Sequence, residues 1–346
     1  MESTLVTARI NPCYWWCYFR GRRARKAGCY RRETMRYFFR AWKLSGSIDD
    51  LLAYALFRRD LGYRLPNRWV SSFGHEIHLL KPGRQILAVA LLLESTESCP
   101  EFLQQRLPFF SGAVQLPAVL SCLHKNGVSL DSMQLLLRQA HDQQQQWRDA
   151  FREGLLKQLA AGGVCVVGNA GNMRRALLGD IIDQHGCVIR FNQFSSPEAD
   201  GSDLGRKLDA WVVTPNFQIT VLPESFSGVV ILTGPDVRFR LLNWSGVSAV
   251  LKNNLTLLTV PLPVWRALVR ELAAPPSAGM LLLAWLKDLL GSWSGVSVAG
   301  FGALSDTKSD YHYTNSKHKA FTRHNWAAES VTLRRWQQEG LRSLHG

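Results

Sequence analysis

The stretch Val164-Cys165-Val166-Val167-Gly168-Asn169-Ala170-Gly171-Asn172 decides the fold prediction, together with Val188-Ile189-Arg190-Phe191-Asn192 further along the chain. The first stretch has the pattern of a buried strand that opens into a glycine turn, and the second that of a strand ending at an asparagine. A glycine turn after a strand presents free backbone N–H groups, which is how many α/β domains hold a phosphate. Open α/β sheets bind ligands at their carboxyl edge, so Asn169 and Asn192 are candidates for a nucleotide or nucleotide-sugar site.

The remainder of the C-terminal half continues this alternation. Short β-rich runs occur at 210–213, 228–232, 255–260 and 296–299, and helical patterns occur at 263–273 and 279–290. Strands that alternate with helices predict a mostly parallel sheet covered on both faces. The predicted fold class is therefore α/β with a Rossmann-type sheet.

The N-terminal half has a different texture. Apolar residues recur at helical spacing over 33–44, 48–61, 83–93 and 129–160. The glutamine-rich segment 142–147 is expected to be an exposed helical connector. Ala160-Ala161-Gly162-Gly163 is a stop signal. We therefore predict a helical region over residues 1–160 and a catalytic domain over residues 161–346.

Composition limits the class of protein. The chain has 346 residues with 41 Lys and Arg against 27 Asp and Glu, a formal net charge of +14, and this excess favours anionic partners. The seven cysteines show no C-x-x-C spacing, which argues against a disulfide framework or a zinc ribbon. No signal peptide or bilayer-spanning run is evident, so we expect a cytoplasmic protein, peripheral on the inner membrane at most.

The N-terminal cluster Tyr14–Lys26 places aromatic residues beside arginines and a lysine. This composition fits an anchor on an anionic membrane surface. It also fits single-stranded nucleic acid, which binds through base stacking. The plainer alternative is a helix that packs its aromatics on the domain and solvates its charges, and the sequence leaves all three open.

Three downstream segments could carry chemistry. Pro276-Ser277-Ala278-Gly279 begins an apolar helix, where the serine either caps the helix or helps to hold an anion. Val296–Gly302 is a strand that runs into a Gly-Phe-Gly turn, and His312 follows it. His324 and Glu329 precede a basic helix. A lone histidine is more often structural than catalytic, and neither a Gly-Lys-Ser/Thr loop nor a complete G-x-G-x-x-G is present.

Taken together and in this order, these segments resemble the four motifs of glycosyltransferase family 29, the sialyltransferases. The resemblance covers roughly residues 164–330, about half of the chain. The four segments that match are 166–205 for the long motif, 276–302 for the short motif, His312-Tyr313 for the third motif and 324–329 for the last. The run Phe191–Phe194 is also similar to the bacterial sialyltransferases of family 42.

The resemblance implies a GT-A-like variant fold, a CMP-activated sugar-acid donor, inversion at the anomeric carbon, and no metal or other cofactor. By motif, Asn169 and Asn192 would bind CMP, and Ser277, Gly279 and Gly302 would line the donor pocket. His312 would stabilise the leaving phosphate, and His324 would act as general base. These residue types suit the chemistry, since an imidazole can accept a proton near neutral pH or stabilise developing phosphate charge.

The chain departs from the family pattern in ways that affect the prediction. The animal enzymes pair a cysteine of the long motif with one of the short motif, but Val164 stands at the first position and the helix 281–290 has no cysteine. The usual Ser/Thr-Gly pair is Ala278-Gly279. The missing disulfide favours a bacterial-type, cytoplasmic member, and Ala278 weakens one contact that the resemblance implies with the donor.

The predicted function is transfer of sialic acid, or a related sugar acid such as Kdo, from CMP to a glycan acceptor such as a lipopolysaccharide or capsule precursor. Two alternatives remain. One is a non-catalytic nucleotide-binding or scaffold protein of the same fold. The other is a nucleic-acid-binding protein that uses the basic N-terminus; the resemblance makes this less favoured.

Overall fold

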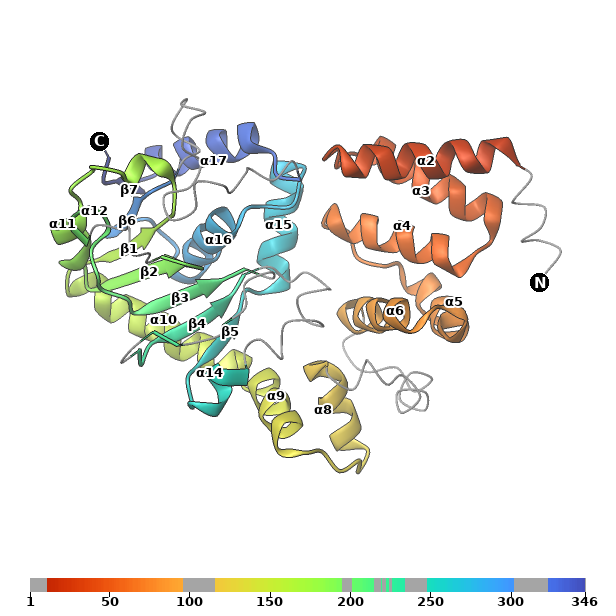
Figure 1. The fold of residues 1–346 in the computed structure, drawn as a ribbon, viewed down its shortest axis with the longest axis horizontal. Coiled ribbons are helices and arrows are strands. Elements are labelled where there is room, and N and C mark those ends of the chain that lie inside the picture. Colours follow the sequence, from red (N-terminus) through yellow and green to blue (C-terminus); the bar gives the residue numbers. More distant parts are fainter. Residues whose placement is uncertain are drawn as a thin grey trace.

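The structure is a computed structural model. It describes residues 11–95, 116–194, 201–214, 219, 222–223, 226–233, 248–301 and 323–345. The chain forms a stack of N-terminal helices beside an α/β unit (Figure 1). This arrangement confirms the predicted fold class, a parallel sheet preceded by a mostly helical region.

A seven-stranded sheet with the strand order β5-β4-β3-β2-β1-β6-β7 forms the centre of the α/β unit. Every neighbouring pair of strands is parallel. The six predicted strands are present, whereas β7 was not predicted from the sequence. The strands are β1 (Val164–Val167), β2 (Cys187–Phe191), β3 (Ala210–Val213), β4 (Val229–Leu232), β5 (Leu257–Thr259), β6 (Val296–Ala299) and β7 (Arg342–Ser343).

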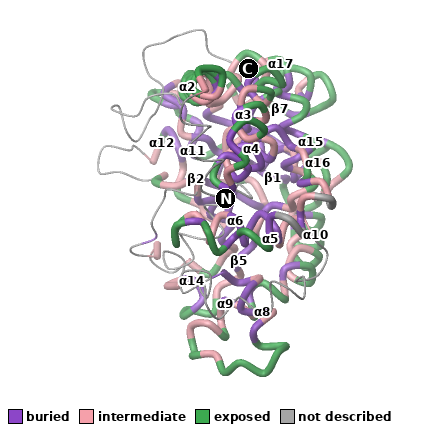
Figure 2. The backbone as a smooth tube through the Cα atoms, turned by 90° about the vertical axis from the view of Figure 1, so that its right-hand side faces the viewer, coloured by how far each residue is buried: buried purple, intermediate pink, exposed green. Residues whose placement is uncertain are grey.

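Strands β1, β3 and β4 are apolar along their whole length because both faces of the sheet are covered there (Figure 2). On one face Val164 and Val166 pack into a core shared with helices α10 (Gln144–Ala160), α15 (Leu262–Leu272), α16 (Ala278–Leu290) and α17 (Trp326–Gln338). On the other face the alternate residues Cys165 and Val167 pack with α11 (Gly179–Asp183) and α12 (Gly201–Leu204). The short helix α14 (Ser248–Lys252) covers the same face near β4 and β5.

The N-terminal helices have a core of their own, centred on Phe57, Phe73 and Leu92. Helix α2 packs against α3, and α3 packs against α4. Helix α4 in turn contacts α5 and α6 (Figure 1). The helical elements are α2 (Pro12–Lys26), α3 (Arg32–Ser45), α4 (Ile48–Asp60), α5 (Asn67–Glu76), η1 (Ile77–Leu79), α6 (Pro82–Ser95), α8 (Pro117–Lys125) and α9 (Ser132–Asp142).

Helix α15 is one place where the two parts of the molecule meet. The Arg59 guanidinium lies 4.8 Å from the centroid of the Trp265 ring. Two hydrogen bonds of 2.7 Å hold the same guanidinium to the buried carboxylate of Glu94. A Cβ at Gly62 would lie 2.9 Å from the backbone oxygen of Arg266, so the loop after α4 also approaches α15 closely. The cation–π contact of Arg59 with Trp265 and the close backbone approach at Gly62 thus join the helices to the sheet unit.

The glutamine-rich segment 142–147 is not simply the exposed connector that the sequence predicted. Gln144 is buried, and its side-chain amide donates to the backbone oxygen of Leu257 at 2.7 Å and accepts from the backbone N–H of Thr259 at 2.8 Å. It therefore satisfies backbone groups of β5, the edge strand, which would otherwise be open to pairing. A tertiary partner 115 residues away made this glutamine a core residue.

Helix α10 packs on the sheet. Leu155 belongs to the core of the sheet, and the Phe151 ring lies 5.7 Å from the ring of Trp285 in α16. The division at residue 160 into a helical region and a catalytic domain stays a prediction. Within the described part of the chain, no helix is both long and apolar enough to cross a bilayer.

Candidate functional site

The order of the strands creates a switch point between β1 and β6. From β1 the chain proceeds outward through β2 to β5 on one side, and β6 then returns to the other side of β1. In sheets of this kind the ligand crevice lies at the carboxyl ends of the two strands where the direction reverses. Those ends carry Gly168-Asn169 after β1 and Gly300-Phe301 after β6. The two predicted glycine turns therefore lie side by side.

The two turns are in close backbone contact. Gly168 donates to the backbone oxygen of Ala299 at 2.8 Å, and Ala170 donates to the backbone oxygen of Gly300 at 3.0 Å. A Cβ on Gly168 would collide with the Gly300 oxygen, and one on Gly300 would collide with the Gly168 oxygen. Gly300 also has φ +69°, in the region that glycine favours. Glycine at both positions thus lets the backbones of the two turns approach each other this closely.

Asn169 stands at the end of β1 and reaches across to β2. Its Nδ2 donates to the backbone oxygens of Phe191 at 2.9 Å and Gln193 at 3.3 Å. These bonds fix the orientation of the amide. Among the described residues its Oδ1 has no hydrogen bond, so the side chain can offer an acceptor into the crevice.

Asn192 stands at the end of β2 with φ +45°, an uncommon conformation outside glycine. Its Oδ1 accepts from both the backbone N–H and the hydroxyl of Thr214, at 2.9 and 3.0 Å. Its backbone oxygen accepts from the Trp211 indole at 2.7 Å. The side-chain oxygen is therefore engaged in joining β2 to β3. Asn192 can contact a ligand through Nδ2, as a hydrogen-bond donor.

Ser277 and Gly279 reach the same edge through the start of α16. Ser277 is the N-cap residue, and its hydroxyl accepts from the backbone N–H of Met280 at 3.4 Å. A Cβ on Gly279 would lie 2.8 Å from the Phe301 ring, which in turn lies 6.4 Å from the ring of Phe191. Phe301, which the sequence reasoning did not single out, thus seats the helix start against the ends of β6 and β2.

His324 lies beside the segment that leads into α16. Its Nδ1 is 2.8 Å from the backbone oxygen of Pro275, so Nδ1 donates and Nε2 keeps the lone pair. Burial lowers the pKa of His324 to about 4; the bond to Pro275 raises it and the charge of Arg323 lowers it further. The imidazole is therefore neutral at pH 7, with a fixed tautomer.

Glu329 ties the last motif to the start of α16. It is 1% exposed, and its carboxylate accepts from the backbone N–H of Ser277 at 2.7 Å. Burial raises the pKa of Glu329 to about 7, against hydrogen bonds from Ser277 that lower it. The sequence predicts Glu329 just before the final helix, but it lies in the first turn of α17. In the structure it positions Ser277, two residues from the Pro275 oxygen that holds His324.

His345 is a neighbour of the crevice that the sequence did not indicate. Its Nε2 accepts from the backbone N–H of Gly300 at 3.0 Å and lies 3.2 Å from the sulfur of Met173. Burial lowers its pKa. The local sequence could not predict the role of His345, because its partners come from the turn after β6 and from the turn after β1.

The structure brings together five of the seven predicted site residues: Asn169, Asn192, Ser277, Gly279 and His324. Gly302 and His312 lie outside the described residues. Within the described ranges there is no group of three or more His, Cys, Asp or Glu side chains placed to hold a metal ion. The six cysteines in that part of the chain are all free thiols.

Comparison with known proteins adds a family. Residues 128–231 match the model described as glycosyltransferase family 29 (sialyltransferase). The match spans Asn169 and Asn192, whereas Ser277, Gly279 and His324 lie beyond it. No curated protein shows significant similarity to the chain.

Two solved structures are similar to this chain. One is a crystal structure of a mammalian sialyltransferase in complex with Gal-beta-1-3GalNAc-ortho-nitrophenol, with 23% identity and a TM-score of 0.40. The other is a crystal structure of a mammalian sialyltransferase, with 24% identity and a TM-score of 0.41. Each comparison covers 54% of this chain and 70% of the other.

Proposed function

We propose that the chain belongs to glycosyltransferase family 29, the sialyltransferases, whose model matches residues 128–231, and that its switch-point crevice binds the CMP half of the donor. In this proposal it is a CMP-sugar-dependent glycosyltransferase that transfers sialic acid. The observation that carries the proposal is the convergence of the β1 turn, the β6 turn and the start of α16 at one edge of the sheet. Such an edge offers backbone N–H groups and a helix N-terminus to a phosphate.

In this proposal the two asparagines recognise the nucleotide. Asn169 offers Oδ1, since its Nδ2 is held by Phe191 and Gln193. Asn192 offers Nδ2, since its Oδ1 is held by Thr214. One acceptor and one donor from adjacent strands match the mixed hydrogen-bonding groups of a cytidine. Ser277, Gly279 and Gly302 would line the rest of the donor pocket.

His324 is the proposed general base. Its bond to Pro275 leaves Nε2 as the atom that would take the proton from the acceptor hydroxyl. A pKa of about 4 makes the imidazole a weak base in the free enzyme. The donor brings a phosphate and a carboxylate, and negative charges close to an imidazole raise its pKa. Donor binding would therefore raise the basicity of His324 when it is needed.

The departing CMP must be stabilised without a resident metal in this proposal. His312 would donate to the leaving phosphate, helped by N–H groups at the start of α16. Displacement by the acceptor oxygen inverts the anomeric carbon. The family resemblance and these residue types support this mechanism. A chelator that abolished transfer would refute it.

We place the enzyme in the cytoplasm, peripheral on the inner membrane, acting on a lipopolysaccharide or capsule precursor. This location is supported by the strongly basic N-terminal helices, which would be attracted to an anionic membrane surface. Their attachment along α15 places them beside the unit that holds the crevice, so they are suited to present an acceptor. Sialic acid is the family's sugar; a related CMP-linked acid such as Kdo is the alternative donor.

The test is to incubate the protein with CMP-sialic acid and CMP-Kdo separately and to measure CMP release with and without glycan acceptors. We expect acceptor-dependent release with one donor and no loss of rate in a chelator. His324→Ala should lower kcat by about 10²–10⁴-fold. The control is His124→Ala, an exposed histidine of α8 outside the crevice, which should keep full activity.

One outcome would refute the assignment of the general base, and another would refute the transfer function. Undiminished transfer by His324→Ala would remove the general base. CMP binding without release from either donor would favour the non-catalytic nucleotide-binding alternative.

A further inference from the structure

Helices α2 and α3, residues 12–45, form a pair that we call the basic hairpin. These residues include ten arginines and lysines and one acidic residue, Glu33. Their net charge is therefore +9, against +14 for the whole chain. About two thirds of the excess charge is thus concentrated in about a tenth of the sequence, which a need for solubility alone does not explain.

The exposed side of α2 is aromatic at its start and basic at its end. At about 3.6 residues per turn, Trp15, Trp16 and Phe19 fall on one arc of the helix. Their exposed fractions are 37%, 49% and 60%. The cations Arg20, Arg22, Arg23 and Lys26 follow on the same arc in the later turns.

The opposite side of α2 already satisfies the packing of the helix. Cys17 and Gly21 are buried, and a Cβ on Gly21 would lie 3.4 Å from Phe38 and from Tyr37 of α3. Phe38 stacks on Phe57 of α4, with ring centroids 5.0 Å apart. The aromatics of the outer arc are therefore not needed to build the core.

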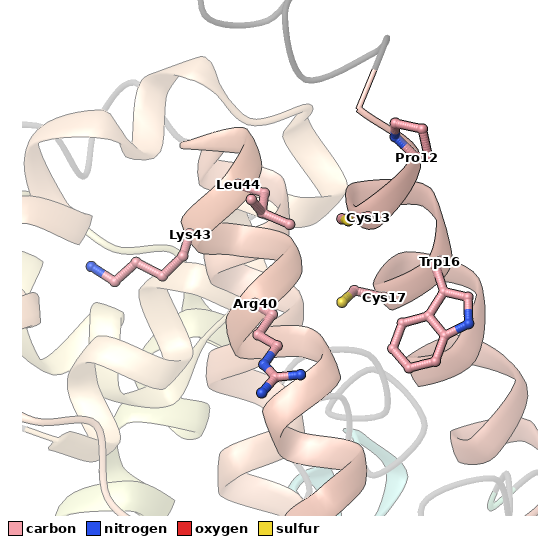
Figure 3. A pocket seen from close by; sticks show the side chains of 7 residues that line it. All are labelled: Pro12, Cys13, Trp16, Cys17, Arg40, Lys43 and Leu44. Carbon is pink, nitrogen blue, oxygen red and sulfur yellow. The ribbon is translucent and has the colours of Figure 1, made fainter.

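A groove of about 650 Å³ runs between α2 and α3 (Figure 3). Its walls are mostly apolar, and Cys13 and Cys17 point from α2 toward α3. Leu44 and Arg40 face them from α3, while the Lys43 ammonium points away from α2 and lies 4.5 Å from the centroid of the Trp42 ring. Neither Arg40 nor Lys43 forms an ion pair with any residue that the structure describes. The lining residues are Pro12, Cys13, Trp16, Cys17, Arg40, Lys43 and Leu44.

We propose that the outer surface of the basic hairpin docks on an anionic lipid bilayer. Trp15, Trp16 and Phe19 would enter the interface, where amphipathic rings are favoured. Arg40, Lys43 and the cations of α2 would contact lipid phosphates while their alkyl stems cover apolar surface. The groove would take the region where an acyl chain joins its headgroup. The binding rests on this surface alone, and its purpose, to meet a lipid-carried acceptor, rests on the proposed function.

The arrangement of the rings favours a bilayer over single-stranded nucleic acid. Trp15 and Phe19 stack on each other, with centroids 5.5 Å apart. The guanidinium of Arg22 lies 4.2 Å from the Tyr18 centroid and that of Arg20 lies 5.6 Å from the Trp16 centroid. One face of each ring is thus covered by a neighbour, whereas bases bind by stacking on open faces. An interface needs only exposed ring area.

The experiment measures binding of the full chain to vesicles of phosphatidylcholine alone and to vesicles in which phosphatidylglycerol replaces part of it. We expect binding to the anionic vesicles only, weakened by salt. The double variant Arg40→Gln/Lys43→Gln should lower the partition coefficient by about 30-fold, since each cation near a charged bilayer contributes about 1 kcal/mol. Trp16→Ala/Phe19→Ala should also lower it, with less dependence on salt.

The matched control is Lys125→Gln/Lys157→Gln, which removes two charges at exposed positions of α8 and α10. It should bind anionic vesicles almost as the unchanged protein does. Equal binding to both kinds of vesicle, an equal loss in the control, or stronger binding to single-stranded RNA than to anionic vesicles would overturn the proposal.

Transfer to a soluble acceptor, measured on the same samples, separates the two proposals. We expect Arg40→Gln/Lys43→Gln to keep this activity, which also shows that the variant is folded. Vesicle binding without any transfer would leave the docking surface standing and refute the proposed function. Transfer without vesicle binding would do the reverse.

Discussion

The helical region and the sheet unit handle polar groups in opposite ways. At one edge of the sheet unit, Asn169, Ser277 and His324 are fixed by backbone partners from other elements. The helical region buries Asp50 and an ion pair, Arg59 with Glu94, and exposes most of its other charged side chains. A site that must hold one ligand in one geometry needs fixed groups, whereas a surface that meets a fluid partner does not.

The largest expected effect is on the buried ion pair of the helical region, whose Arg59 also contacts Trp265 of α15. Glu94→Gln leaves the Arg59 charge buried without its carboxylate, and losing one member of a buried pair costs about 3–5 kcal/mol. We expect the free energy of unfolding in urea to fall by that amount. The matched control, Asp49→Asn, breaks an exposed pair with Arg84 and should cost less than about 1 kcal/mol. Similar losses from both would show that the buried pair has no special role.

The second prediction concerns how stability depends on pH at the crevice. The unfolded chain releases the Glu329 proton near pH 4.5, whereas the native state keeps it to about pH 7, so the free energy of unfolding falls as pH rises through this window. His324 acts in the opposite sense. Its native pKa of about 4 lies below the ordinary 6.5, so the free energy of unfolding rises with pH between these values. Each contribution is on the order of 3 kcal/mol, and the two nearly cancel.

Single variants should separate the two opposing dependences of the free energy of unfolding on pH. Glu329→Gln keeps an acceptor for Ser277 and leaves the His324 slope, so stability should rise between pH 4 and 6.5. His324→Ala leaves the Glu329 slope, so stability should fall between pH 4.5 and 7. Urea unfolding over this range measures both. Identical profiles for the two variants would mean that neither group is shifted as the burial of both requires.

A smaller effect is expected at His345, which supports the β6 turn. His345→Ala removes the acceptor of the Gly300 N–H, a loss of about 1 kcal/mol in stability. Because Gly300 lies in the β6 turn at the crevice, KM for the CMP donor should rise more than kcat falls. His345→Gln, whose amide oxygen can accept the same bond, should restore KM in part. An unchanged KM in His345→Ala would separate this residue from donor binding.

The smallest effect on stability is expected on the outer arc of the basic hairpin. Trp16→Ala should change the free energy of unfolding by no more than about 0.5 kcal/mol, because half of its side chain is exposed. Phe38→Ala in the same hairpin, buried against Phe57, should cost about 3–5 kcal/mol. A large loss from Trp16→Ala would make it a packing residue and weaken the case for a docking surface.

The sequence predicted the strands well because their signal is local. Runs such as Val164–Val167 and Ala210–Val213 are apolar throughout, as strands buried on both faces must be. It did not predict β7, since two residues, Arg342 and Ser343, carry no periodicity. It also placed Gln144 on the surface, because glutamine is usually exposed and nothing nearby in the chain indicates that β5 needs its amide.

The candidate site divides in the same way. The sequence by itself determined that two glycine turns, two asparagines and a serine at a helix start occur in this order, and the resemblance gave them roles. Only the tertiary structure decided which atoms remain available. The oxygen of Asn192 is engaged by Thr214, Nδ1 of His324 by Pro275 and the N–H of Ser277 by Glu329. The physical reason is that a residue's type and turn are set by its neighbours in the chain, whereas its hydrogen-bond partners and its pKa are set by residues far away in sequence that packing brings close.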